Sequence, residues 1–167
     1  MERKRILITG MSGTGKSTVI AELQARGFAA IDLDTDQWCE WVPIAGGNGV
    51  DGDRDWVWRE DRVGNLLAYH RDGVLFISGT ASNQVRFYRH LEYIVLLSSP
   101  AEVMARRLAN RTTNPYGRRP EELERCLRLK QTVEPQLRKA ATVEVDTSAP
   151  LDEVVSVILR LIAPAVE

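Results

Sequence analysis

The sequence predicts a three-layer α/β fold, in which a five-stranded parallel sheet lies between two layers of helices. Two continuous apolar runs, at 74–78 and 93–97, have the length and composition of strands that are buried on both faces. Segments with helical spacing and turn signals separate the strand-like runs. This alternation is typical of parallel strands joined by right-handed helical crossovers.

The first predicted strand, at 5–9, leads into the segment Gly10-Met11-Ser12-Gly13-Thr14-Gly15-Lys16-Ser17. This segment has every fixed position of the phosphate-binding loop G-x-x-x-x-G-K-[S/T]. Its glycines let backbone N–H groups turn toward phosphate oxygens. Lys16 would reach the β- and γ-phosphates, and the Ser17 hydroxyl would ligate the Mg²⁺ that bridges them. A helix predicted from Ser17 to Arg26 supplies the strand–loop–helix context that the motif requires.

We therefore expect ATP and Mg²⁺ to bind at this loop. Thr18 would open a helix whose N-terminal dipole attracts the phosphates. The residues expected to contact the nucleotide here are Gly10, Ser12, Gly13, Thr14, Gly15, Lys16, Ser17 and Thr18.

Composition and length restrict the class of protein. With 44% hydrophobic and 27% charged residues, the chain is neither disordered nor membrane-spanning in composition, and 167 residues fit one domain over 1–167. No signal-peptide pattern or long apolar run is found, so we expect a cytoplasmic protein without a membrane partner. We expect it to be a monomer or a homodimer. A net charge of −1 does not favour nucleic-acid binding. The two cysteines are too far apart in sequence to indicate a zinc site or a disulfide framework.

Two acidic residues follow the second predicted strand, at 28–31. Asp32 and Asp34 would lie at the carboxyl edge of the sheet, where ligands bind in open parallel sheets and where the phosphate loop also lies. We expect them near the Mg²⁺ ion or the phosphoryl acceptor. The alternative is a helix N-cap within a solvated acidic turn.

The segment from 37 to 55 lacks clear periodicity and contains a Gly-rich piece at 45–49, so it is predicted to be a mobile loop. A helix is predicted to resume around Trp56. Trp38 and Trp41 would either pack in the core or form an apolar wall for a planar or ring-shaped acceptor. We therefore expect the acceptor-binding segment at about 35–70.

The second half of the chain continues the alternation. A helix is predicted at 101–110, and 111–120 cannot be regular because it holds two prolines and a glycine. We interpret this arginine-studded stretch as a lid. A further helix at 121–139 would be kinked or broken by Pro135. A last strand is predicted at 141–145, before a C-terminal amphipathic helix.

In chain order, these features resemble the small P-loop kinases that include shikimate kinase, gluconate kinase and the nucleoside monophosphate kinases. The resemblance covers essentially the whole chain and rests on the phosphate loop, Asp32-x-Asp34, Trp58-Arg59, Ser78-Gly79-Thr80 and Arg107-x-x-x-Arg111. It implies a P-loop NTPase fold with strand order 2-3-1-4-5 and an arginine-rich lid. It also implies transfer of the γ-phosphoryl group of ATP, with Mg²⁺, to a small molecule. Three sequence segments resemble segments of small bacterial ATP-binding proteins that are described as shikimate-kinase-like. These segments lie at 58–62, 83–88 and 114–117.

The resemblance also implies roles on the acceptor side. Asp34 would be the carboxylate at the acceptor hydroxyl, and Asp32 the one at the metal. Arg59 is similar to the arginine that grips an anionic group of the acceptor. Gly79 and Thr80 belong to the turn that lines the same pocket.

The lid and nucleotide roles are carried over in the same way. Arg111, and after it Arg118, would stabilise the charge on the moving phosphoryl group as the lid closes. Arg107 would stack on adenine. The loop from Thr147 to Pro150 resembles the loop that contacts the base.

Three departures from the family leave the acceptor open among nucleosides, nucleotides, sugars and cyclitol acids. The tryptophan-rich segment from Trp38 to Trp58 has no close counterpart in these kinases. Val133 stands where shikimate kinase has an acceptor-binding arginine. The turn at 78–82 lacks the acid and the arginine of the nucleoside monophosphate kinases. These departures motivate an alternative function, a nucleotide-binding regulatory or adaptor protein with slow ATPase activity.

Overall fold

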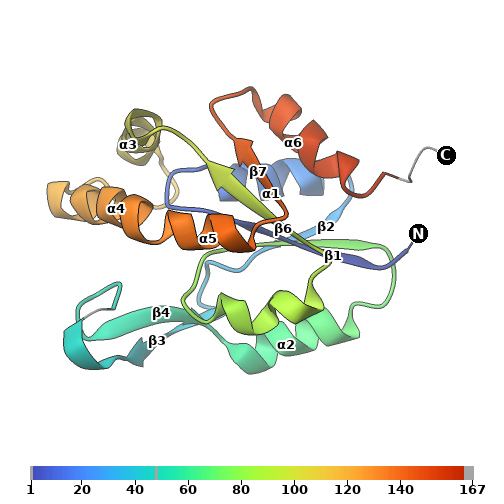
Figure 1. Ribbon diagram of the computed structural model, residues 1–167, viewed down its shortest axis with the longest axis horizontal. Helices are drawn as coiled ribbons and strands as arrows, with labels where there is room; N and C mark the ends of the chain where they lie inside the picture. Colours follow the sequence, from blue (N-terminus) through green and yellow to red (C-terminus); the bar gives the residue numbers. More distant parts are fainter. Residues whose placement is uncertain (1, 48, 164–167) are drawn as a thin grey trace.

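A five-stranded parallel sheet forms the centre of the computed structural model, which describes residues 2–47 and 49–163 (Figure 1). Its strands are β1 (Lys4–Thr9), β2 (Ala29–Asp32), β5 (Val74–Ser78), β6 (Tyr93–Ser98) and β7 (Val143–Asp146). They lie in the order β2-β5-β1-β6-β7, and every neighbouring pair is parallel. Counted over these five strands alone, this is the predicted order 2-3-1-4-5. The predicted fold class is confirmed.

Helices cover both faces of the sheet (Figure 1). Their bounds are α1 (Lys16–Ala25), α2 (Glu60–Tyr69), α3 (Ala101–Asn110), α4 (Pro120–Thr132), α5 (Glu134–Ala140) and α6 (Leu151–Arg160), with short 3₁₀ helices η1 (Ala45–Gly47) and η2 (Gln84–His90). Within the described ranges, no helix is both long enough and apolar enough to cross a bilayer.

The side chains of β1 show how the sheet is buried on both faces. Because successive residues of a strand point to opposite faces, Ile6 and Ile8 pack with α1 and α6, whereas Leu7 packs with α2 and η2. A third apolar cluster joins Leu96 of β6 to α3 and α5. The continuous apolar runs in the sequence reflect this double coverage.

A β-hairpin, absent from the predicted elements, lies beside the sheet. Strands β3 (Cys39–Pro43) and β4 (Arg54–Trp58) pair antiparallel, so the prediction of a helix beginning near Trp56 is wrong, and α2 begins at Glu60. The prediction of an irregular loop over 37–55 is also corrected by β3 and η1. Asn48 of the predicted Gly-rich loop lies outside the described residues. Cross-strand pairing fixes this segment, and such pairing is not visible in local helical spacing.

The segment predicted to be a lid has the irregular backbone that its prolines and glycine predict, between the end of α3 and the start of α4. The helix predicted at 121–139 is divided into α4 and α5 at Val133. Pro135 lies in the first turn of α5, where its missing N–H costs no helical hydrogen bond. The break therefore falls just before the proline.

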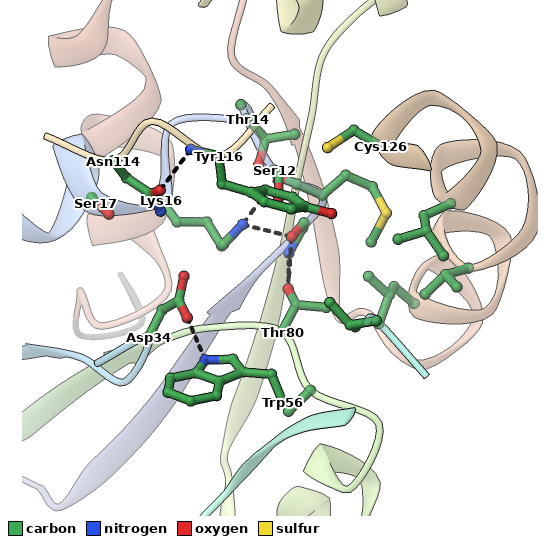
Figure 2. A pocket seen from close by; sticks show the side chains of 18 of the residues that line it. Ser12, Thr14, Lys16, Ser17, Asp34, Trp56, Thr80, Asn114, Tyr116 and Cys126 are labelled. Carbon is green, nitrogen blue, oxygen red and sulfur yellow. Dashed lines mark hydrogen bonds between the residues drawn. The ribbon is translucent and has the colours of Figure 1, made fainter. Parts of the chain in front are cut away.

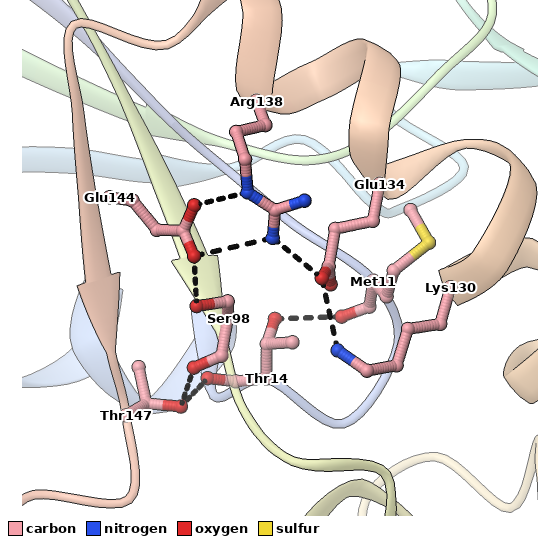
Figure 3. A network of polar contacts seen from close by, with 8 residues as sticks. All are labelled: Met11, Thr14, Ser98, Lys130, Glu134, Arg138, Glu144 and Thr147. Carbon is pink, nitrogen blue, oxygen red and sulfur yellow. Dashed lines mark hydrogen bonds and ion pairs between the residues drawn. The ribbon is translucent and has the colours of Figure 1, made fainter.

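An ion-pair network fastens α4 and α5 to the sheet (Figure 3). Glu134 is buried, and its carboxylate accepts hydrogen bonds of 3.0 Å from Lys130 and from Arg138. Arg138 also donates to Glu144 at 2.5 Å, and Ser98 donates to Glu144 at 2.9 Å. The network connects two helices with β6 and β7 beside the phosphate loop.

Candidate active site

The phosphate loop joins the end of β1 to the start of α1. Gly10, Gly13 and Gly15 have φ values of +154°, +84° and +95°, which L side chains rarely adopt. A Cβ atom on Gly10 would lie 2.4 Å from the carbonyl oxygen of Leu97, closer than any real contact. The glycines thus leave the loop backbone accessible to an anion at the N-terminus of α1, where the helix dipole attracts negative charge.

Lys16 points into the cleft from the first residue of α1 (Figure 2). Its ammonium group donates to the carbonyl oxygens of Gly10, at 2.7 Å, and Met11, at 3.0 Å. Burial lowers the pKa of Lys16 to about 8, although the carboxylates of Asp34 and Asp32 act in the opposite direction. The Lys16 ammonium group can therefore exchange these carbonyl oxygens for phosphate oxygens with little movement of the side chain.

Ser17 and Asp32, the predicted metal ligands, lie together. The Ser17 hydroxyl donates to Asp32 Oδ2 at 2.8 Å, and Asp32 Oδ1 accepts from the Asp34 amide at 3.0 Å. A hydroxyl and a carboxylate at a phosphate loop suit Mg²⁺, which takes few protein ligands and completes its shell with phosphates and water. In keeping with this, no group of three or more His, Cys, Asp or Glu side chains forms a metal cage in the described part of the chain. The residues present fit the ion.

Asp34 makes a contact that the sequence did not indicate. Trp56 Nε1 of β4 donates to Asp34 Oδ1 at 2.8 Å, and both residues line the cleft (Figure 2). Trp56 is paired with Trp41 of β3, and their ring centroids lie 5.0 Å apart. The sequence feature that points to this role of Trp56 is its alternation with Trp58. This alternation can be interpreted as a strand only when the hairpin is recognised.

Thr80 connects the end of β5 to the phosphate loop. Its hydroxyl accepts from the Gly10 amide at 3.1 Å, lies 2.6 Å from the Gly10 carbonyl oxygen and lies 2.9 Å from the Thr9 hydroxyl. Gly79 does not line the cleft. A Cβ atom there would lie 3.2 Å from Trp58 Nε1, so packing against Trp58 explains this glycine.

Arg111 of the lid lines the cleft and donates to the carbonyl oxygen of Tyr116. Its Nε is buried without a hydrogen-bond partner among the described residues, and burial lowers the pKa of the guanidinium. A buried donor facing a cleft is available to an anionic ligand. Arg118 donates to the carbonyl oxygen of Arg111 and supports the lid backbone.

Arg107 and Thr147 join the phosphate loop to the loop after β7. Arg107 Nη1 donates to the Thr147 hydroxyl at 2.8 Å and to the Gly13 carbonyl oxygen at 3.4 Å. The Thr147 hydroxyl donates to the Thr14 carbonyl oxygen at 2.7 Å. The predicted nucleotide side of the cleft is therefore one connected hydrogen-bonded unit.

Arg59 and Trp38 lie away from the cleft. The Arg59 guanidinium donates to Glu40 at 3.0 Å and to the carbonyl oxygen of Cys39 at 3.0 Å. Trp38 packs against the apolar cluster under α2. Their predicted contact with an acceptor stays a prediction.

Most of the predicted site residues surround one cleft of about 1890 Å³. The predicted site residues that line it are Gly10, Ser12, Gly13, Thr14, Gly15, Lys16, Ser17, Thr18, Asp32, Asp34, Thr80, Arg107, Arg111 and Thr147. The predicted site residues outside its lining are Trp38, Arg59, Gly79, Arg118 and Pro150. Arg125 of α4, a residue that the sequence did not indicate, also lines the cleft and donates to the Val50 carbonyl oxygen at 2.6 Å.

Comparison with known proteins identifies the family of the chain. A family model described as an AAA domain matches residues 6–130. The shikimate kinase of Mycobacterium avium (strain 104) is 34% identical over 153 residues, which cover 89% of this chain and 86% of that protein. The shikimate kinase of Chlorobium chlorochromatii (strain CaD3) is 29% identical over 126 residues, covering 68% of this chain and 63% of the relative.

Solved structures show the same fold. A shikimate kinase from Acinetobacter baumannii in complex with shikimate has a TM-score of 0.64 and 17% identity, and the match covers 95% of this chain and 92% of that one. A gluconokinase from Sinorhizobium meliloti 1021 has a TM-score of 0.55 and 21% identity, covering 95% and 93%.

The fold and the phosphate loop define a P-loop small-molecule kinase that uses ATP with Mg²⁺. Within that class, the chain belongs to the shikimate kinase family. The alternative function, an adaptor with slow ATPase activity, is not favoured by these relatives.

Proposed function

We propose that the protein transfers the γ-phosphoryl group of ATP to a hydroxyl of a small acceptor bound between the β3–β4 hairpin and α4. One observation carries this proposal, the placement of two carboxylates at one edge of the sheet. Asp32 is bonded to Ser17 on the phosphate side, and Asp34 is bonded to Trp56 on the hairpin side. This separation gives each carboxylate a different partner and a different task.

In the proposed reaction, the bond between the γ-phosphorus and the oxygen shared with the β-phosphate breaks, and a bond forms between that phosphorus and the acceptor oxygen. Asp34 orients the acceptor hydroxyl and takes its proton, which passes to water after ADP and the phosphorylated product leave. Lys16 and Arg111 stabilise the charge on the transferred oxygens. Ser17 and Asp32 would hold the Mg²⁺ ion, which would neutralise charge on the phosphates when bound.

The test is ADP formation with a panel of nucleosides, nucleotides, sugars and cyclitol acids. One acceptor should raise ATP turnover sharply. With that acceptor, Lys16→Ala and Asp34→Asn should each lower kcat by about 100-fold or more, because each removes a group that acts in the transition state. Asp61→Asn, an exposed change in the first turn of α2, is the matched control and should leave kcat unchanged.

Full phosphoryl transfer by both the Lys16→Ala and the Asp34→Asn proteins would contradict these roles. Thermal-shift measurements with ATP and the same panel give an independent readout, because a ligand that binds only the folded state raises Tm by mass action.

A further inference from the structure

The hairpin gives the acceptor end of the cleft an aromatic wall. Trp41 and Trp56 stand opposite each other on β3 and β4, with ring planes 55° apart, and both line the cleft. Trp41 is 44% exposed, which is unusual for a tryptophan unless another surface covers it. The two tilted rings give the cleft aromatic surface next to the carboxylate of Asp34, and the ring of a ligand can pack against such a surface.

Further apolar side chains line the same cleft. Leu129 of α4 and Val133, at the junction of α4 and α5, contribute aliphatic surface. Val85 and Tyr88 of η2 line it as well. The acceptor therefore meets apolar surface from the hairpin, from η2 and from the helices beyond the lid.

Four arginines on this side of the cleft are paired within the protein, whereas Arg111, assigned above to the transferred phosphoryl group, keeps a buried Nε without a partner among the described residues. Arg59 is bonded to Glu40 and lies outside the cleft lining, and Arg54 pairs with Asp51 while its guanidinium stacks 4.7 Å above the ring of Trp41. Arg125 donates to the Val50 carbonyl oxygen. Arg128 lines the cleft at its solvent edge, where it is 63% exposed and pairs with Glu124 at 3.8 Å.

Carboxylates, in contrast, face the acceptor end. Asp34, Asp36 and Asp55 all line the cleft. Asp55 accepts a hydrogen bond from Ser82 at 2.6 Å, and Asp34 accepts the one from Trp56. Carboxylates at this end would repel a carboxylate or phosphate on the acceptor, but they would accept hydrogen bonds from its hydroxyl groups.

We propose that the acceptor is an uncharged, ring-bearing polyol, a sugar, cyclitol or nucleoside that carries no carboxylate or phosphate. Its ring packs against the Trp41–Trp56 pair, and one of its hydroxyls is the group that Asp34 orients. The inference rests on the proposed phosphoryl transfer and names the substrate class of that same site.

Matched acceptor pairs test the charge requirement directly. Suitable pairs are shikimate with its methyl ester, glucuronate with glucose, and adenosine monophosphate with adenosine. In the pair that contains the preferred scaffold, the uncharged member should have a kcat/KM at least tenfold higher than the anionic one. A preference for the anionic member overturns the inference and leaves phosphoryl transfer standing. ADP formation that is indifferent to all members overturns both.

A second measurement addresses the aromatic wall. Trp41→Leu keeps apolar volume but loses the planar face, so it should raise the KM of the preferred acceptor about tenfold while the KM of ATP stays within twofold. Tyr69→Leu is the matched control, because Tyr69 is 70% exposed on α2 and lies outside the cleft lining. Equal KM values for the acceptor in the Trp41→Leu and Tyr69→Leu proteins would overturn the wall assignment, and melting curves of both show whether the fold is kept.

Discussion

At the scale of single residues, the hydrogen bond from Trp56 positions Asp34, the carboxylate that we propose orients the acceptor. An indole N–H bonded to one carboxylate oxygen leaves the other oxygen free and restricts rotation of the carboxylate. Trp56→Phe keeps the aromatic ring and removes the donor. We expect kcat to fall about tenfold with a smaller change in the acceptor KM, because a hydrogen bond to a charged group contributes about 1.5–3 kcal/mol. Steady-state kinetics with the preferred acceptor measure both constants.

Trp41→Phe is the comparison for this prediction, since Trp41 belongs to the same hairpin but makes no hydrogen bond to Asp34 in the described structure. It should lower kcat less than Trp56→Phe does. The positioning role would be wrong if both variants lost kcat equally, or if Trp56→Phe changed only the acceptor KM.

The phosphate-loop residues were accessible from the sequence because their geometry is local. Eight contiguous positions fix the loop, and the glycine requirement at Gly10 arises from its own φ and from the backbone of Leu97. Trp56 and Arg125 were not accessible in this way. Their partners, Asp34 and Val50, lie 22 and 75 residues away in the chain.

At the scale of elements, the contact between α4 and the hairpin loop closes one side of the cleft. Arg125→Ala removes the hydrogen bond to the Val50 carbonyl oxygen. We expect amide hydrogen exchange across 49–54 to become faster and the acceptor KM to rise several-fold, because the hairpin loop loses its attachment to the helix. Hydrogen exchange followed by mass spectrometry resolves this segment.

The control is Arg128→Ala, three residues further along α4, where the side chain pairs with Glu124 instead of the hairpin. Hairpin exchange should stay at the wild-type rate in this variant. Unchanged exchange in the Arg125→Ala protein would show that other contacts hold the loop.

Elements with a strong local pattern were predicted well, and the hairpin was not. The strands β5 and β6 coincide with the two apolar runs in the sequence, and α3 begins directly after Pro100 as predicted. The residues of β4 fit helical spacing as well as the alternation of a strand. Their pairing with β3 determines that they form a strand. The part of the fold that belongs to the acceptor site was therefore the part least visible in the sequence.

At the scale of the whole molecule, the ion pair between Glu144 and Arg138 makes stability depend on acid pH. The hydrogen bonds from Arg138 lower the pKa of Glu144 below its ordinary value of 4.5. The unfolded chain then binds the proton at higher pH than the folded one, so this contribution is complete above pH 4.5 and is lost as pH falls through the folded pKa.

Glu144→Gln should therefore lower the free energy of unfolding at pH 7 by up to about 1 kcal/mol, because the pair is partly exposed, and this deficit should shrink below pH 4.5. Urea denaturation across this range measures it. Glu124→Gln, in the more exposed pair on α4, is the control and should change stability little at any pH. A constant deficit for Glu144→Gln at all pH values would contradict the linkage.

Thr80 has a consequence for how the molecule assembles. It lies two residues beyond Ser78, which is in register with Ile8 of β1, and its hydroxyl bonds to Gly10 immediately after that strand. A slip of β5 by a single residue would turn this side chain to the opposite face of the sheet and remove it from the loop. Correct alignment of β5 with β1 is consequently a condition for the contact between Thr80 and the phosphate loop.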